Sequence, residues 1–371
     1  MSRALNFNAG PASLPFAALE RAKEELLDFE KSGMSVMEHS HRGKVYEKVH
    51  HEAIALVKKH LAVGDDWEVL FVQGGASQAF AQLPLNFLER GKTADYIVTG
   101  AWGEKAVQEA KAGASMGIGE VKVAATTVKD KSYVRVPKQD ELSLTSGAAY
   151  VHCTSNETIH GVEYAVDASM PFPTTTAPLF CDMSSDIFGR QIDVSKFSLI
   201  YGGAQKNIGP SGVTIVAAKK DVIASGRKDL PAILQYRTHA ENQSLYNTPP
   251  TFGIYLVRNV LQWLEGQGGV AGMEARNKKK AGAIYGAIDA SGGFYRCPVD
   301  VACRSIMNVV WRLPTPELEE EFVKDAQAQQ MIGLKGHRSV GGVRASIYNA
   351  VEPAWCEQLA SFMKDFAAKK G

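Results

Sequence analysis

Lys206 lies in a short glycine-rich connection that could activate its side-chain amine. The connection spans residues 201–212, YGGAQKNIGPSG, and joins the apolar runs 197–200 and 213–218. Both runs are short and rich in branched residues, so we expect two buried strands. The glycines and the proline permit tight turns that leave Lys206 projecting where the strands end. Loss of solvation there would lower the lysine pKa, as Schiff-base chemistry requires. The alternative is a surface lysine in a hairpin turn.

Asp182 ends a second apolar run that precedes this connection. Residues 178–181 are apolar, and small polar residues follow Asp182. The pattern predicts a parallel strand with Asp182 at its carboxyl end, where open α/β sheets bind ligands. Pyridoxal phosphate needs an anion against its pyridinium nitrogen and a lysine for its aldehyde, and two strand ends could supply both. Asp182 could instead be an ordinary turn or N-cap residue. The pair is more specific than either member.

A glycine turn after another apolar run could bind a phosphate. Residues 73–77, QGGAS, close a strand predicted over 67–73 and open a helix predicted over 78–88. Free amides and the helix dipole at such a start attract anions. The segment matches neither GxxxxGK[ST] nor GxGxxG, and it could also be a simple turn. After the next strand, Trp102 could stack on a flat cofactor or pack in the core.

Three elements concentrate basic and imidazole groups, which suits a small substrate with several negative charges. They are residues 39–44 (HSHRGK), residues 335–338 (KGHR) and Arg344. Arginine forks bind carboxylate and phosphate bidentately, whereas the alternative for each group is solvated surface charge. His39 and His41 have the spacing of a metal pair. Because no carboxylate or cysteine stands at ligand spacing, we expect no metal.

The composition limits the partners and the cellular compartment that we expect for this protein. The chain has 371 residues, 41 basic against 40 acidic and a net charge of +1, which favours neither nucleic acid nor a membrane surface as partner. Its five cysteines are odd in number and lack CxxC spacing, so a reducing compartment is expected. The start has no apolar core of the signal-peptide type, and no apolar run is long enough to span a membrane. We therefore expect a cytoplasmic protein.

Strands alternating with helices predict an α/β fold with a mostly parallel sheet. Besides the runs around Asp182 and Lys206, the expected strands are 67–73, 96–99 and 148–153. The expected helices are 15–31, 45–61, 78–88, one ending at 112, and 251–265. After the glycines at 266–269 come a helix at 273–289, a strand at 305–313, a helix at 316–330, a strand at 343–348 and a helix at 353–370. We predict a large cofactor-binding α/β domain at 15–266 and a small α+β domain at 267–371, with residues 1–14 packing on the small domain.

Seven segments together resemble the phosphoserine aminotransferases, a family of fold-type I pyridoxal-phosphate enzymes of class V. The resemblance covers nearly the whole chain. It rests on NFNAGPASLP (6–15), SVMEHSHRGK (35–44), FVQGGASQAF (71–80), SNETIHGVE (155–163), GGAQKNIGPSG (202–212), NTPPTF (247–252) and KGHRSVGGVRASIYNA (335–350). The last segment and HSHRGK separate this family from other aminotransferases more than the lysine loop does.

The resemblance implies a role for each matching residue. Lys206 would be the Schiff-base lysine and Asp182 the partner of the pyridine nitrogen. The remaining cofactor contacts would come from Ala76, Ser77, Trp102, Thr158 and Gln205, and from Asn247 and Thr248 of the other subunit of a homodimer. The substrate phosphate would meet His41 and Arg42, with His337 and Arg338 across the dimer, and Arg344 would hold the α-carboxylate. Some family members have arginine where Ser77 stands, so here the phosphate would depend more on amides and hydroxyls.

The implied reaction is amino transfer between L-glutamate and 3-phosphohydroxypyruvate, which gives 2-oxoglutarate and O-phospho-L-serine for serine biosynthesis. A phosphorylated four-carbon oxo acid of pyridoxine biosynthesis is a further expected substrate. Another fold-type I enzyme would keep Lys206 and Asp182 but not the distal basic cluster. A nucleotide-dependent oxidoreductase should show GxGxxG, and a binding protein would not need a buried lysine facing an acid.

Overall fold

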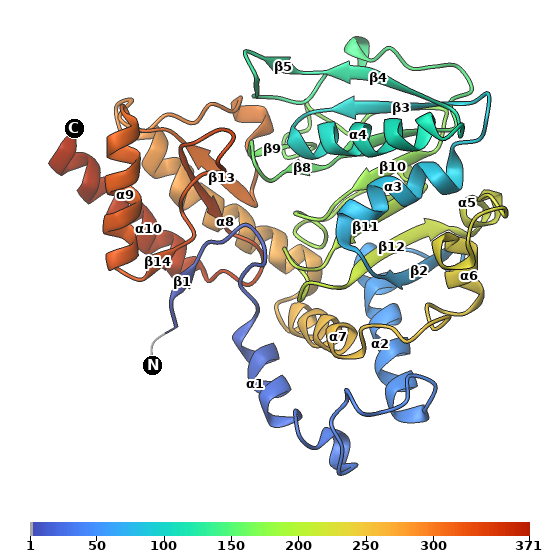
Figure 1. The fold of residues 1–371 in the computed structure, drawn as a ribbon. Helices are drawn as coiled ribbons and strands as arrows, with labels where there is room; N and C mark the ends of the chain where they lie inside the picture. Colours follow the sequence, from blue (N-terminus) through green and yellow to red (C-terminus); the bar gives the residue numbers. More distant parts are fainter. Residues whose placement is uncertain (1–2) are drawn as a thin grey trace.

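A seven-stranded sheet carries the strand ends on which the predicted site depends (Figure 1). The computed structural model describes residues 3–371. The strand order is β2-β12-β11-β10-β7-β3-β4, and all strands run parallel except β12, which is antiparallel to both neighbours. The strands are β2 (Trp67–Val72), β3 (Thr93–Val98), β4 (Glu120–Thr126), β7 (Tyr150–Thr154), β10 (Leu179–Asp182), β11 (Leu199–Gly203) and β12 (Thr214–Lys219). The predicted mostly parallel α/β fold is confirmed.

Helices and two short hairpins surround this sheet. The helices α3 and α4 pack side by side, and α2 packs on α7 at the β2 end of the sheet (Figure 1). The helices are α1 (Phe16–Glu24), α2 (Lys44–Leu61), α3 (Gly75–Phe87), α4 (Ala101–Ser115), α5 (Lys220–Ser225), α6 (Tyr236–Glu241) and α7 (Thr251–Gly266). The hairpins pair β5 (Val128–Lys129) with β6 (Ser132–Tyr133) and β8 (Asn156–Glu157) with β9 (Val162–Glu163).

A smaller unit with its own core contains the last third of the chain. Its antiparallel strands β13 (Asn308–Trp311) and β15 (Val343–Ser346) lie against three helices, α8 (Gly269–Asp289), α9 (Pro316–Ala328) and α10 (Pro353–Lys370). The start of α9 follows from its sequence, because the Thr315 hydroxyl accepts the Leu318 amide and Pro316 occupies the first turn. Phe322, Trp311 and Met363 are buried in this core.

The N-terminal segment joins that smaller core. Strand β1 (Leu5–Asn6) pairs in parallel with β14 (Met331–Ile332), and Phe7 is buried beside Trp311 and Ala345 in the same apolar cluster. Residues 1 and 2 of the predicted segment lie outside the described residues. The division at 266–267 stays a prediction; the apolar cluster of the larger unit extends to Met273, inside α8.

One predicted helix was too long, and one strand was not predicted. The helix expected over 15–31 ends at Glu24, because Glu30 and Lys31 adopt left-handed backbone angles and Leu27, at 83 % exposure, has no core to cover. The sequence pattern also missed β4, an edge strand whose residues are mostly half-exposed. None of the helices between residues 3 and 371 has the length and apolar character to cross a membrane.

Candidate active site

The carboxyl ends of β10 and β11 place the predicted acid and lysine in one site. The two strands are parallel neighbours in which Asp182 pairs with Tyr201. After β11 ends at Gly203, a tight turn returns Lys206 toward the sheet edge. Gly202 permits the close approach of the two strand ends, since a Cβ there would lie 3.3 Å from the Ser184 Cα. The local sequence therefore builds the geometry that its glycines and strands predicted.

The Lys206 amine is held between a hydroxyl, an indole and two carboxyl groups. Its Nζ donates to Thr158 Oγ1 at 2.7 Å and lies 4.8 Å from the centroid of the Trp102 ring. Burial lowers the pKa of Lys206, while Asp182 and Glu157 act in the opposite direction. A desolvated amine of this kind is a better nucleophile and base than a surface lysine. The connection does join the antiparallel strands β11 and β12, but Lys206 is not a surface lysine.

The Asp182 carboxyl group is buried and oriented from one side. Its Oδ1 accepts from the Ser184 amide at 2.9 Å and from the Ser184 hydroxyl at 2.5 Å. The same hydroxyl accepts the Gly203 amide at 3.1 Å, which ties the acid to the neighbouring strand. Burial raises the pKa of Asp182, and the Lys206 charge opposes that shift. Within the described part of the chain, Oδ2 has no hydrogen-bond partner, so it can meet a ligand atom.

Helix α3 offers a free N-terminus at the same edge. Gly74 and Gly75 have φ values of 87° and 66°, which favour glycine, and no side chain caps the helix start. Ala76 is half-buried and Ser77 is exposed in the first turn. The unpaired amides can hold a phosphate.

Helix α4, by contrast, has a protein carboxylate at its N-terminus. Glu157 accepts the Trp102 amide at 3.0 Å and the Gly103 amide at 2.8 Å. Glu157 was not predicted to belong to the site. Its position immediately before Thr158 in the segment 155–163 could have indicated it, but its hydrogen-bond partners lie on α4, more than 50 residues earlier in the chain.

The β8–β9 hairpin also connects Lys206 with an arginine. The Thr158 carbonyl accepts from Arg344 Nη1 at 3.4 Å, and the buried Arg344 Nε has no partner among residues 3–371. Burial lowers the pKa of Arg344. Arg344 and His337 line a cavity of about 110 Å³ together with His160 and Tyr133. A cationic group with an unsatisfied donor beside a cavity can hold an anionic ligand.

The N-terminal loop closes one side of the site. The Ala12 amide donates to the Gln205 carbonyl at 2.9 Å, and the Tyr348 hydroxyl donates to the Ala9 carbonyl at 2.7 Å. A Cβ at Gly10 would lie 3.3 Å from the Lys206 Cγ. This loop was predicted to pack on the small domain, but its contact with the lysine turn had no periodic pattern to reveal it.

Other predicted site residues are not gathered around Lys206 within one chain. His41 and Arg42 lie in the turn that leads into α2. Arg42 and Arg338 are exposed, as are Asn247 and Thr248. The Thr248 carbonyl accepts from the Gln73 side chain at 3.5 Å, near the start of α3. Thr248 therefore lies near the α3 start of its own chain, whereas no hydrogen bond among the described residues joins His41, Arg42 or Arg338 to Lys206.

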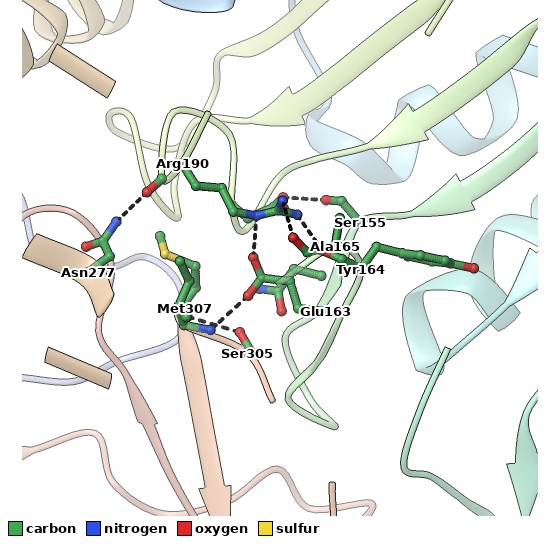
Figure 2. A network of polar contacts seen from close by, with 12 residues as sticks. Ser155, Glu163, Tyr164, Ala165, Arg190, Asn277, Ser305 and Met307 are labelled. Carbon is green, nitrogen blue, oxygen red and sulfur yellow. Dashed lines mark hydrogen bonds and ion pairs between the residues drawn. The ribbon is translucent and has the colours of Figure 1, made fainter. Parts of the chain in front are cut away.

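A buried ionic network supports the turn behind Asp182 (Figure 2). Arg190 Nε donates to Glu163 Oε1 at 2.9 Å, and its Nη2 lies 3.5 Å from Asp186 Oδ2. Asp186 also accepts from the Ser155 hydroxyl, and burial raises its pKa to about 7. The second oxygen of Glu163 accepts the Ile306 amide of the small unit at 2.9 Å. The network thus links the β10 turn, the β8–β9 hairpin and the small unit.

A separate cavity of about 440 Å³ does not involve this site. That cavity lies behind the β10 turn, against Met183 and Asp186, and holds none of the predicted site residues. The described residues contain no group of three or more His, Cys, Asp or Glu side chains that could bind a metal ion. The sheet edge itself brings together a lysine, a carboxyl group and a free helix N-terminus.

Comparison with known proteins identifies the class. Residues 4–359 match the model of the class-V aminotransferases. The phosphoserine aminotransferase of Niallia circulans is 52 % identical over 370 residues, covering 100 % of this chain and 99 % of that one. The Bacillus subtilis phosphoserine aminotransferase is 50 % identical over 366 residues, with 99 % of both chains covered. The structure of a PLP-bound phosphoserine aminotransferase from Trichomonas vaginalis has a TM-score of 0.92 at 39 % identity and covers 98 % of this chain and 100 % of its own.

The chain is a class-V aminotransferase in sequence and in fold. Within that class, the chain belongs to the phosphoserine aminotransferase family.

Proposed function

We propose that the chain is a pyridoxal 5′-phosphate enzyme that transfers the amino group between L-glutamate and 3-phosphohydroxypyruvate, giving 2-oxoglutarate and O-phospho-L-serine. The observation that carries the proposal is the convergence of the desolvated Lys206 amine with Asp182, Thr158 and the Trp102 ring. Full-length relatives at about half identity are phosphoserine aminotransferases.

The residues around Lys206 fit this cofactor. Lys206 would bind its aldehyde carbon, Thr158 would donate to its phenolic oxygen, and the Trp102 indole would cover its ring. Asp182, with its unpartnered Oδ2, would face the pyridine nitrogen. The free amides of α3 at Ala76 and Ser77, assisted by Gln205, would hold the phosphate. When bound, pyridoxal phosphate supplies an electron sink for the α-carbon of the amino acid.

The side chains of the chain itself would move the proton. Once released from the cofactor aldehyde, the Lys206 amine would accept the proton from the substrate α-carbon as a general base. It would then donate that proton as a general acid to complete the amino transfer. Its burial favours this role because a neutral amine is needed at the start. Asp182 would stabilise a protonated pyridine nitrogen by its negative charge, and the Ser184 bonds would keep its carboxylate in place.

Substrate recognition would use the basic groups. Arg344, beside the small cavity, would pair with the α-carboxylate through its free Nε. His337 and Arg338 would meet the distal phosphate together with His41 and Arg42. Because His337 lines the same cavity as Arg344, whereas His41 and Arg42 lie in the turn before α2, we also propose a homodimer in which His41 and Arg42, rather than His337 and Arg338 as the resemblance implied, serve the neighbouring site together with Asn247 and Thr248. A cytoplasmic location belongs to the same proposal.

The activity is tested by half-reactions of the holoenzyme with phosphoserine, glutamate and serine. Each charge-assisted hydrogen bond is worth about 1.5–3 kcal/mol, so two such bonds should favour phosphoserine over serine by roughly two to four powers of ten. Arg42→Ala should lower kcat/KM strongly for phosphoserine, less for glutamate and least for serine. Arg90→Ala, an exposed arginine near Gly117, is the control. Equal losses for all three substrates would reject phosphate recognition by Arg42.

The shared site is tested by hybrid dimers. A Lys206→Ala subunit and an Arg42→Ala subunit should each be inactive as homodimers. If Arg42 serves the neighbouring lysine, the hybrid holds one site with both residues intact and should recover up to half of the wild-type activity per dimer. Hybrids that form but stay inactive would reject sharing through Arg42.

A second substrate is tested by a separate assay. Measuring the activity with 3-phosphohydroxypyruvate and with the phosphorylated four-carbon oxo acid of pyridoxine biosynthesis would show whether the enzyme also accepts the second compound.

A further inference from the structure

We propose that Glu157 is a positioning residue of this active site: its carboxylate binds the N-terminus of α4, fixes Trp102 over the cofactor position and closes that helix end to other anions. The inference rests on the proposed function, since it assumes that the cofactor binds beside Trp102. Glu157 does not touch the cofactor position through a hydrogen bond of its own; it acts through Trp102.

The two carboxylate oxygens are divided between two successive amides. Oε2 accepts from the Trp102 amide at 3.0 Å, and Oε1 accepts from the Gly103 amide at 2.8 Å. The side chain of Glu157 is completely buried. A carboxylate that accepts two amides in the first turn of a helix also interacts favourably with the helix dipole. The backbone of Trp102 is therefore held directly by a residue of the β8–β9 hairpin.

Two glycines leave the space that this carboxylate occupies. A Cβ at Gly100 would lie 2.3 Å from the carboxyl carbon of Glu157, and a Cβ at Gly103 would lie 3.3 Å from its Oε1. Gly100 has an extended backbone with φ of 170°, so glycine is required there for space rather than for its backbone angle. The residues on both sides of Trp102 are thus adapted to the Glu157 carboxylate.

Glu157 also acts on the charges of the site. Burial raises its pKa to about 7, and the Gly103 and Trp102 amides oppose this shift. The carboxylate in turn raises the pKa of Lys206, which burial lowers. The indole whose backbone it holds lies 4.8 Å from Lys206 Nζ. One buried acid is therefore coupled both to the aromatic ring and to the amine.

The geometry gives the N-termini of α3 and α4 different roles. Strands β2 and β3 run in the same direction within the sheet, so α3 and α4 both begin at its carboxyl edge. Either helix start could attract a phosphate. Glu157 fills the start of α4, and the start of α3 remains free. A single anion-binding helix end is left for the cofactor phosphate.

The test measures cofactor affinity and cofactor orientation rather than turnover alone. Apo-protein of the wild type, Glu157→Gln and Glu157→Ala is titrated with pyridoxal 5′-phosphate, and the induced circular dichroism of the bound cofactor is recorded. Glu104→Gln is the matched control, because Glu104 is exposed in the same first turn and bonds Tyr133 instead of Trp102. Thermal unfolding of each apo-protein gives the effect on the fold.

We expect Glu157→Gln to weaken cofactor binding by about tenfold, since its amide group can accept only one of the two backbone N–H groups and opposes the other. Its dichroism should differ from that of the wild type, while Glu104→Gln matches the wild type in both. Formate, a small carboxylate, should restore part of the affinity of Glu157→Ala by filling the vacated helix end, and should leave the wild type unchanged.

Each contrary outcome has a definite meaning. Cofactor affinity within twofold of the wild type and an unchanged dichroism in Glu157→Gln would overturn the inference. So would a Glu157→Gln protein that cannot fold, because Glu157 would then serve the fold and not the position of Trp102. Failure of the wild type itself to bind the cofactor would instead reject the proposed function.

Discussion

Thr158 Oγ1 accepts a hydrogen bond from Lys206 Nζ at 2.7 Å. The threonine belongs to the β8–β9 hairpin and the lysine to the turn after β11, so the bond joins two loops that leave the same edge of the sheet. The carbonyl of the same threonine accepts from Arg344 of the small unit. A short hairpin therefore fixes the distance between the amine and the arginine.

Lys206 should carry the cofactor. Borohydride reduction of the holoenzyme followed by peptide mapping should place the pyridoxyl group on Lys206, because its amine is desolvated and lies beside Asp182 and Trp102. Lys280 is the internal comparison, since it is also buried but its Nζ donates to the Ile347 and Tyr348 carbonyls. Label on Lys280, or on a surface lysine, would contradict the assignment.

Asp182→Asn should impair the chemistry more than the fold. The amide keeps the size of the side chain but removes the charge that would hold a proton on the pyridine nitrogen. The rate constant of the glutamate half-reaction, measured by stopped flow, should fall by at least about a hundredfold, or roughly 2.7 kcal/mol. Asp193→Asn, which changes an exposed acid bonded to Ser195, is the control. A rate within about twofold of the wild type would exclude this role for Asp182.

Arg190→Met should destabilise the protein strongly. The change leaves the buried Glu163 and Asp186 carboxyl groups without their shared cation, and loss of one partner of a buried ion pair costs about 3–5 kcal/mol. Chemical denaturation at fixed protein concentration measures the loss. Arg227→Met removes an ion pair with the exposed Asp229 and should change the free energy of unfolding little. Equal effects of the two substitutions would show that the network in Figure 2 does not stabilise the turn.

His50 should make the fold sensitive to acid. Burial lowers the pKa of His50 to about 4, whereas an unfolded histidine titrates near 6.5, so only the unfolded chain binds this proton between those values. Stability is therefore lost as the pH falls below about 6.5, by about 1.4 kcal/mol per pH unit for this group. His50→Gln should give a shallower dependence of unfolding free energy on pH over that range. A slope equal to that of the wild type would contradict the prediction.

Much of the site could be predicted because it depends on short-range patterns. The apolar runs before Asp182 and on both sides of the Lys206 turn are long enough to specify strands, and parallel strands bring their carboxyl ends together. The glycines at 74 and 75 predicted the free helix end in the same way. Each of these inferences uses neighbouring residues and one general rule of sheet topology.

The missed features depend on contacts between distant segments. Glu157 follows a strand like many surface acids, and only the three-dimensional structure shows its carboxylate against the amides of Trp102 and Gly103. The edge strand β4 lacks a buried face with strict alternation, so its pattern resembles a loop. His41 and Arg42 matched a family segment, but no hydrogen bond among the described residues joins them to Lys206. The role proposed for them depends on a second subunit, whereas the resemblance implied that His337 and Arg338 would come from it.

The pairing of β1 with β14 has a consequence for how the protein is made. Leu5 and Asn6 leave the ribosome long before their partners, Met331 and Ile332, which are 326 residues further along the chain. The loop that follows β1 rests on the Lys206 turn through Ala12 and Gly10. The larger sheet can assemble during translation, at about 5–20 residues per second, while the N-terminal segment still waits for its partner strand. This pairing therefore cannot hold the N-terminal loop over the lysine turn until β14 has been synthesised.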